Sequence, residues 1–331
     1  VIVHAGDFKV DLTPVDGQNF DFARLSEIGE EGVDLLLSES TNAAVPGFTP
    51  AEKSVGENLK EEFKKAKGRI IIAAFASHVH RLQQIIDIAK ENRRKIAING
   101  RSMIKVFDIA SKIGYLKIPK GMVIDIEKTK KLKPSEITIL CTGTQGEPLA
   151  ALSRIANGIH KHIILEKNDT VIISATPIPG NEKAVYRNIN NLMKKEANVV
   201  FEKIVGIHVS GHGGQDEQKI YLNLIKPKYF IPIHGEYFML KKHKELALAV
   251  GVKKENVIIA ENGNKIEMTK NHCKIVGKVQ SGITLIDGFG VGDVGTVVLK
   301  DRQSLGDDGI VIISLYQYKN GAFSKNIEVV T

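Results

Sequence analysis

Residues 69–98, RIIIAAFASHVHRLQQIIDIAKENRRKIAI, decide the fold class of this chain. The stretch begins with a run of β-branched and small residues, Arg69–Phe75, and ends with a second run, Lys95–Ile98. Between the two runs, apolar residues recur with helical spacing over Leu82–Arg94. A strand, a helix and a second strand in this order predict a βαβ unit with parallel strands.

The same alternation continues on both sides of this unit. The further helices that we predict are Glu52–Ala66, Met103–Ile113, Leu149–His160 and Asn181–Lys195. The further strands that we predict are Ile137–Cys141, Thr170–Ala175 and Val199–Phe201. Repeated alternation of this kind predicts an α/β domain in which helices cover both faces of a parallel sheet.

The two ends of the chain have a different pattern. Short apolar strands, Val1–Val3 and Val33–Leu37, run directly into small polar or acidic residues. Later, short strands are expected to end at Ser210–Gly214 and at His234–Glu236, with a helix over Asp216–Leu224 between them. Polar groups at strand ends are typical of scaffolds that present catalytic side chains.

Composition excludes several classes of protein. Of the 331 residues 43% are hydrophobic and 25% are charged, which argues against disordered, collagen-like and disulfide-rich chains. No apolar run reaches the roughly 18–20 residues that span a bilayer, so we expect no membrane protein. Cys141 and Cys273 lie far apart and form no CxxC pair, which favours a reducing cytosol over a thiolate metal site.

The net charge of +8 favours a polyanionic partner, although a basic protein without such a partner fits equally well. The basic run Lys128, Lys130, Lys131 and Lys133 is predicted to be a solvated loop, with a phosphate-binding track as the alternative.

Histidines and carboxylates cluster where strands end. The clusters are His4–Asp7, Ser38–Thr41, Ser210–Gly213 and Pro232–Glu236. Imidazole and carboxylate groups suit Zn²⁺ or Mn²⁺, and an aspartate can bridge two cations. Each cluster taken singly is also compatible with an ordinary turn or cap.

Taken together and in order, the motifs carry a resemblance. GDFK (6–9), SEST (38–41), SGHGG (210–214) and PIHGEY (232–237) resemble the later motifs of the metallo-β-lactamase superfamily with a β-CASP insertion, and in particular the bacterial ribonuclease J family. Supporting segments are PGFTPAE (46–52), AAFASHVHRLQQI (73–85), NGRSM (99–103), TGTQGEPLAALSRIA (142–156) and SATPIPGNE (174–182).

The resemblance implies a fold and a division into domains. The expected fold is a partial αββα sandwich of the metallo-β-lactamase type with an inserted parallel-sheet β-CASP domain. The sandwich would use residues 1–51 and 204–275, and the insertion would use residues 52–203. Residues 276–331 would be a linker and the start of a β-rich C-terminal domain, and LKDRQSLGDDGIVIISLYQY (299–318) is interpreted as a linker followed by strand.

The resemblance also implies a role for individual residues. Asp7 would bridge two divalent metal ions and His234 would bind the second; zinc is expected, with manganese or magnesium as alternatives. His212 would donate a proton to the leaving oxygen, and Glu39 would orient and polarise His212. This chemistry suits phosphodiester hydrolysis, because the departing oxygen is a poor leaving group unless it is protonated.

A second site is implied for the 5′ end of RNA. Ser77 and His80 would line a pocket for the terminal phosphate, and Ser210 and Gly211 would form its other wall. The alternative for Ser77 is that its hydroxyl caps the helix that follows. TGTQGEP (142–148) is either a tight strand-to-helix turn or a segment near the RNA channel.

The implied function is a metal-dependent ribonuclease with 5′→3′ exonuclease and endonuclease activity, acting in RNA maturation and mRNA decay. Its partner would be RNA, its location the cytoplasm, and its assembly a homodimer or homotetramer. Two alternatives are a non-catalytic RNA-binding module and an mRNA 3′-processing-type endonuclease of the same superfamily.

The sequence departs from the family pattern in one respect. The family's main ligands come from an HxHxDH motif, and no such motif occurs in these 331 residues. Because a catalytic site takes roughly three protein ligands per metal, we expect this chain by itself to be inactive. We also expect both ends to be truncated, since the first residue is Val1 and the last domain is short.

Overall fold

The computed structural model describes residues 1–178, 180–201, 205–284, 286–287, 290–291, 296–308, 311–314, 316–323 and 328–330. These residues form two compact units, Val1–Ile259 and Ala260–Thr331. Among the described residues, no helix has the length and apolar character needed to cross a lipid bilayer.

A six-stranded parallel sheet forms the centre of the first unit, with the strand order β5-β4-β6-β3-β7-β8. Its strands are β3 (Ile70–Ala73), β4 (Lys95–Asn99), β5 (Val123–Ile124), β6 (Ile137–Cys141), β7 (Thr170–Ile173) and β8 (Asn198–Val200). The α/β class and the parallel sheet predicted from the sequence are therefore confirmed.

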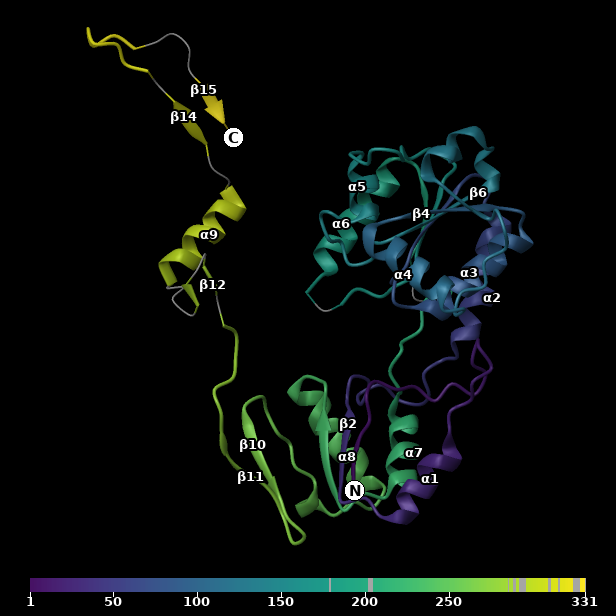
Figure 1. The fold of residues 1–331 in the computed structure, drawn as a ribbon, viewed down its shortest axis with the longest axis vertical. Helices are drawn as coiled ribbons and strands as arrows, with labels where there is room; N and C mark the ends of the chain where they lie inside the picture. The colour runs from purple at the N-terminus through teal and green to yellow at the C-terminus, as the bar shows by residue number, and fades with distance from the viewer. Residues whose placement is uncertain are drawn as a thin grey trace. The chain divides into compact units, whose positions relative to one another are not determined.

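Two hydrophobic cores lie on the opposite faces of this sheet. Ile70 and Ile72 of β3 belong to the first core, whereas Ile71 and Ala73 belong to the second, as the period of two in a strand requires. Helices α2 (Glu52–Lys65), α3 (Val79–Glu91) and α4 (Arg101–Lys112) contribute to the first core. Helices α5 (Ala151–Asn157) and α6 (Glu182–Lys194) contribute to the second core (Figure 1).

A smaller parallel sheet joins distant parts of the sequence in the order β1-β2-β9. Its strands are β1 (Ile2–His4), β2 (Leu35–Glu39) and β9 (Tyr229–Ile233). Helices α1 (Phe22–Glu31), α7 (Gln215–Ile225) and α8 (Tyr237–Ala249) accompany it, and Leu36, Leu222 and Phe230 lie in their shared core. In Figure 1 the early segment α1 and the later segment α7 lie side by side.

The described residues of the second unit form antiparallel strand pairs and a helix. Strands β10 (Asn264–Met268) and β11 (Cys273–Lys278) form an antiparallel hairpin. Strands β12 (Ile286–Asp287) and β13 (Gly290–Val291), and then β14 (Ile312–Ser314) and β15 (Glu328–Val330), pair in the same way. Helix α9 (Thr296–Asp308) lies between these pairs in the sequence.

Several local predictions were wrong. The residues interpreted as a linker, 299–308, are helical in α9, because Leu, Lys, Arg and Gln favour a helix despite Gly306. No strand precedes Ser210 over residues 205–209. The lysines of the basic segment are exposed, as predicted for a solvated segment, but most of the segment is a 3₁₀ helix, Ile126–Lys131. The predicted helix Leu149–His160 is shorter, Ala151–Asn157, and ends at Gly158 in the left-handed conformation. The predicted division into four segments remains a prediction.

Candidate metal and catalytic centre

The small sheet brings the first three site residues to one edge. Glu39 is the last residue of β2, His234 directly follows β9, and Asp7 lies three residues after β1. Because the strands are parallel neighbours, their carboxyl ends meet at this edge, which is where α/β sheets bind ligands. His212 reaches the same place from the segment just before α7.

Asp7, His212 and His234 form a compact group of potential metal ligands. One ligand atom from each residue lies within 4.8 Å of the other two. His234 Nδ1 lies 2.7 Å from Asp7 Oδ1, and the ring centroids of His212 and His234 are 5.7 Å apart. The residues predicted to converge therefore do so, although 227 positions separate Asp7 from His234.

Glu39 is the buried hydrogen-bond partner of His212. It is 1% exposed, and His212 Nδ1 lies 3.1 Å from Glu39 Oε1. Thr41 N donates to Glu39 Oε2 at 3.1 Å. Burial raises the pKa of Glu39, but the hydrogen bonds from His212 and Thr41 outweigh burial and lower it overall. The hydrogen bond to Glu39 raises the pKa of His212, with burial opposing and the charges of Glu39 and Asp7 adding to the rise.

The backbone at His234 is unusual for a residue with a side chain. Its φ angle is +53°, in the left-handed region that favours glycine. The turn is tight, because a Cβ at the following Gly235 would lie 3.1 Å from Met239 Cβ. Strained residues held by their surroundings often mark functional sites, and here the turn connects β9 directly to α8.

Two buried residues that the sequence did not point to hold this edge in place. Ser40 Oγ lies 3.0 Å from Nδ1 of His243, which is fully buried in α8. Burial lowers the pKa of His243 to about 3, so its ring is neutral. Glu217, also fully buried, accepts hydrogen bonds from the backbone N–H groups of Val10 at 2.8 Å, Thr49 at 2.6 Å and Gly214 at 2.7 Å.

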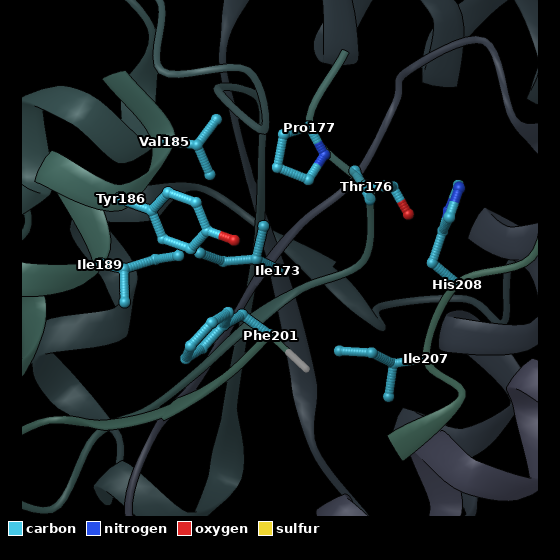
Figure 2. A pocket seen from close by; sticks show the side chains of 10 residues that line it. Ile173, Thr176, Pro177, Val185, Tyr186, Ile189, Phe201, Ile207 and His208 are labelled. Carbon is cyan, nitrogen blue, oxygen red and sulfur yellow. The ribbon is translucent and has the colours of Figure 1, made fainter. Parts of the chain in front are cut away.

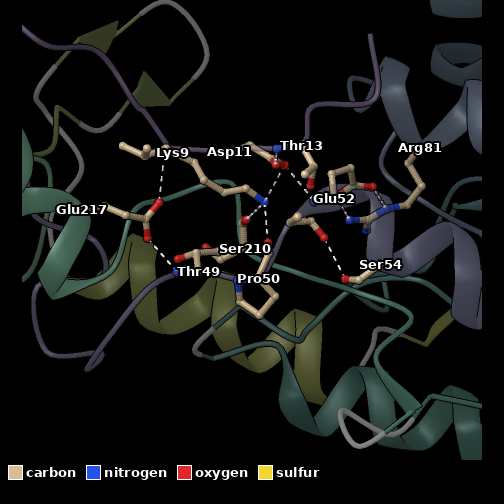
Figure 3. Close-up of polar contacts among 12 residues, drawn as sticks. Lys9, Asp11, Thr13, Thr49, Pro50, Glu52, Ser54, Arg81, Ser210 and Glu217 are labelled. Atoms are coloured by element: carbon tan, nitrogen blue, oxygen red, sulfur yellow. Dashed lines mark hydrogen bonds and ion pairs between the residues drawn. The ribbon is translucent and has the colours of Figure 1, made fainter. Parts of the chain in front are cut away.

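Lys9 connects three segments next to Glu217. Its Nζ donates to the backbone oxygen of Pro50 at 2.8 Å and to that of Ser210 at 3.3 Å, and lies 3.9 Å from Asp11 Oδ2 (Figure 3). Burial lowers the pKa of Lys9, although neighbouring carboxylates, first Asp11, oppose this effect. Lys9 and Glu217 therefore both fix the loop that carries His212.

The residues proposed for the 5′-phosphate fall into two groups. Ser77 and His80 line one hollow, of about 450 Å³, together with Tyr115. Ser210 Oγ instead accepts hydrogen bonds from Asn42 Nδ2 at 3.0 Å and from His212 N at 3.1 Å. Over the described part of the chain, no hydrogen bond or ion pair joins Ser77 or His80 to Ser210 or Gly211.

The helix cap expected at Ser77 belongs to its neighbour. His78 is the N-cap of α3, and its Nδ1 accepts from the backbone N–H of Arg81 at 3.4 Å. The capping alternative for Ser77 was therefore wrong. His80 Nε2 lies 3.3 Å from Asp16 Oδ2, so a phosphate in this hollow would compete with a carboxylate for His80.

Arg81 is a buried arginine. It contacts both segments that connect the two sheets, the first through Glu52 and the second through His208. It is 1% exposed, and its Nε and Nη2 donate to the two carboxylate oxygens of Glu52 at 2.8 and 2.7 Å (Figure 3). Its Nη1 donates to the backbone oxygen of Ser174 at 3.1 Å and to Nδ1 of His208 at 2.8 Å. Burial, and then the charge of Arg81, lowers the pKa of His208 to about 4, so His208 is a neutral acceptor.

A largely apolar cavity of about 350 Å³ lies beside His208. Figure 2 shows the rings of Tyr186 and Phe201 on its walls, with Thr176 and His208 at one side. It contains none of the metal-centre residues, so the centre does not extend into it.

Comparisons with known proteins show which family the chain resembles. The family model described as "Ribonuclease J, beta-CASP domain" matches residues 67–192, and the model described as "Zn-dependent metallo-hydrolase RNA specificity domain" matches residues 196–260. Ribonuclease J of Synechocystis sp. is 46% identical over 329 residues, covering 99% of this chain and 51% of the relative.

Two further relatives are similar to the same extent. Ribonuclease J 1 of Streptococcus pyogenes is 48% identical, covering 94% of this chain and 55% of the relative. Ribonuclease J2 of Bacillus subtilis is 44% identical, covering 94% of this chain and 56% of the relative. The chain thus spans about half the length of the curated relatives that it matches.

The sheet, the potential metal ligands gathered at its strand ends and these matches place the chain in the β-CASP class of the metallo-hydrolases. Within that class, the chain belongs to the bacterial ribonuclease J family.

Proposed function

We propose that the full-length protein is a metal-dependent ribonuclease that hydrolyses phosphodiester bonds of RNA, both from the 5′ end and internally, in RNA maturation and mRNA decay. The observation that carries this proposal is the convergence of Asp7, His212 and His234, with the buried Glu39 behind His212. The ribonuclease J names of the relatives support it.

The donor set fits a divalent metal. A carboxylate and imidazoles within reach of one another are ligands that Zn²⁺ and Mn²⁺ both accept. We infer that Asp7 and His234 hold metal, that two ions are bound, and that zinc is preferred, with manganese or magnesium as alternatives. A bound divalent cation supplies Lewis acidity that stabilises charge on the phosphate. Two ligands alone do not complete such a site, so the full-length protein is the species to test.

His212 is better suited to donate a proton than to bind metal. Its Nδ1 is engaged by Glu39, which leaves only Nε2 to face the cleft. The raised pKa of His212 favours the imidazolium, which cannot bind a cation but can protonate a departing oxygen. Glu39 acts through His212, because its buried carboxylate fixes the orientation and the charge of the ring.

The direct test uses the full-length protein and a single-stranded RNA. Cleavage is expected with zinc, manganese or magnesium, and chelation of the metal should abolish it while RNA binding persists. Asp7→Asn should have the same effect as chelation, because the amide is a weaker ligand. Cleavage that continues after complete chelation would reject the proposal, and binding without cleavage at any metal would favour the RNA-binding module instead.

We also propose that Ser77 and His80 contact the 5′-terminal phosphate of the RNA. Their shared hollow beside Tyr115 supports this, whereas the engagement of Ser210 with Asn42 makes its part in the same pocket less direct. The Ser77→Ala/His80→Ala variant should slow decay of 5′-monophosphorylated RNA at least tenfold, the loss expected for a charge-assisted hydrogen bond.

Internal cleavage by this variant should remain within about twofold of the wild type, because the metal ligands and His212 are unchanged. The two activities are measured on one RNA that carries either a 5′-monophosphate or a 5′-hydroxyl. An equal fall in both activities would mean that the two residues serve the cleft in general and not the 5′ end.

We further infer a homodimer or homotetramer located in the cytoplasm, on the strength of the family resemblance alone. Light scattering on the full-length protein measures the oligomeric state, and fluorescence microscopy of a tagged copy shows the location in the cell.

A further inference from the structure

A cavity of about 700 Å³ lies at the carboxyl ends of β4 and β6. Its walls are the residues that follow β4, from Asn99 to Ser102, together with Thr142 after β6 and Arg154 of α5. These two strands are direct neighbours in the sheet, but α4 follows β4 into the first core and α5 follows β6 into the second. The connections that follow these two neighbouring strands therefore leave to opposite faces of the sheet. Such a topological switch point is the usual place for ligands in sheets of this kind.

Two arginines give this cavity an uncompensated positive charge. Among the residues that the structure describes, neither Arg101 nor Arg154 forms a side-chain hydrogen bond or ion pair. None of the residues that line the cavity is acidic. Another exposed arginine, Arg24, is by contrast paired with Glu27 at 3.0 Å. An anion would therefore find two free guanidinium groups here.

Asn99 adds oriented donors to the cavity. His160 Nδ1 accepts from the backbone N–H groups of His162 at 3.3 Å and Ile163 at 3.1 Å, so the ring proton is on Nε2. Nε2 lies 3.1 Å from Asn99 Oδ1 and must donate to it. The amide oxygen of Asn99 is thereby occupied, and its Nδ2 remains as a donor on the cavity wall.

The loops around the cavity are held closely together. Gly100 has a φ angle of +106°, and a Cβ there would lie 2.5 Å from Thr142 Oγ1. The backbone oxygen of Thr142 in turn accepts from Leu152 N of α5 at 3.0 Å. Only a residue without a side chain fits at position 100, so the backbone that carries Asn99 and Arg101 is held close to Thr142.

We propose that this cavity binds a backbone phosphate of single-stranded RNA between Arg101 and Arg154, with Asn99 as a further donor. The inference rests on the proposed function, since it takes RNA to be the ligand. Planar guanidinium groups match phosphate oxygens in geometry as well as in charge. β6 lies between β4 and β3, and Ser77 follows β3, so the cavity shares a sheet edge with the proposed 5′-end pocket. This shared edge favours contact of both places with one RNA chain.

The test measures binding of a fluorescein-labelled single-stranded RNA to the full-length protein in a chelator, so that no cleavage occurs. The Arg101→Gln/Arg154→Gln variant should raise the Kd at low salt roughly tenfold or more, as expected for lost charge-assisted contacts. The slope of log K against log salt should become shallower by about 0.7, the contribution of one phosphate of a single strand. The Arg101→Lys/Arg154→Lys variant should be intermediate, because it keeps charge but loses the planar donors.

The matched control is Lys64→Gln/Lys112→Gln, which removes the same charge from exposed helix positions paired with Glu61 and Asp108. Its Kd should stay within about twofold of wild type, and the melting temperatures of all variants should agree. An effect of the arginine variant no larger than that of this control would overturn the proposal. The proposal would also be overturned if inorganic phosphate or uridine monophosphate bound at the two arginines and the affinity for RNA did not change. Because binding is measured without cleavage, failure of the nuclease activity alone would leave this result standing.

Discussion

Replacing His212 with alanine in the full-length protein is expected to lower the rate of RNA cleavage by about 10²–10⁴, the usual contribution of general acid–base catalysis. The metal content should remain close to that of the wild type, because Asp7 and His234 keep their ligand atoms. Elemental analysis of purified protein and single-turnover cleavage of a labelled RNA measure the two quantities.

The matched variant is His234→Ala, which should lose metal as well as activity. Equal metal loss in both variants would mean that His212 is a ligand and that its proposed role is wrong. The two roles can be told apart in this way because a ring nitrogen of His212 lies within 4.8 Å of the ligand atoms of Asp7 and His234.

The pH dependence provides an independent check on His212. The hydrogen bond to Glu39 raises the pKa of His212, so the proton donor persists to higher pH than an ordinary histidine would allow. Glu39→Gln removes the charge and should shift the alkaline limb of the cleavage rate to lower pH. An alkaline limb that does not move would show that another group sets it.

Replacing Arg81 with methionine should lower the free energy of unfolding by roughly 3–5 kcal/mol, because it leaves the carboxylate of Glu52 buried without its cation. Urea denaturation followed by circular dichroism measures this change. Arg24→Met, which breaks an exposed pair with Glu27, serves as the control and should cost no more than about 1 kcal/mol.

A second variant separates lost charge compensation from lost packing. Adding Glu52→Gln to Arg81→Met removes the buried charge and should restore part of the lost stability. A loss below about 1 kcal/mol for Arg81→Met alone, or no recovery in the double variant, would contradict the role assigned to this arginine.

The sequence predicted those parts of the fold that depend on local pattern. The β-branched runs at Ile70–Ala73 and Ile137–Cys141 are strands, because a short apolar run of this kind between two helices is typical of a buried strand. The strand order could not be predicted in the same way, since it depends on contacts between residues far apart in the chain. Helix α9 was missed because Gly306 and its polar neighbours are also typical of a linker.

The residues of the candidate site also fall into those that the local sequence pattern indicated and those that depend on contacts between distant residues. Asp7, Glu39 and His234 could be found because they stand where short apolar runs end. Glu217, His243 and Arg81 could not, because each is a polar residue within a helix whose partners lie elsewhere in the sequence. Glu217 did leave one trace: it stands three residues after the N-cap Gly214, a position from which its carboxylate can accept the backbone N–H of the N-cap.

The pairing of β2 with β9 has a consequence for how the protein is made. Glu39 and Ile233 are register partners, yet the ribosome adds 193 residues between them. At roughly 5–20 residues per second this takes about 10–40 s. The contacts of the six-stranded sheet lie within residues 70–200 and are complete well before β9 leaves the ribosome. During translation, we therefore expect the six-stranded sheet to fold first and the edge that carries Asp7, Glu39 and His234 to be assembled afterwards.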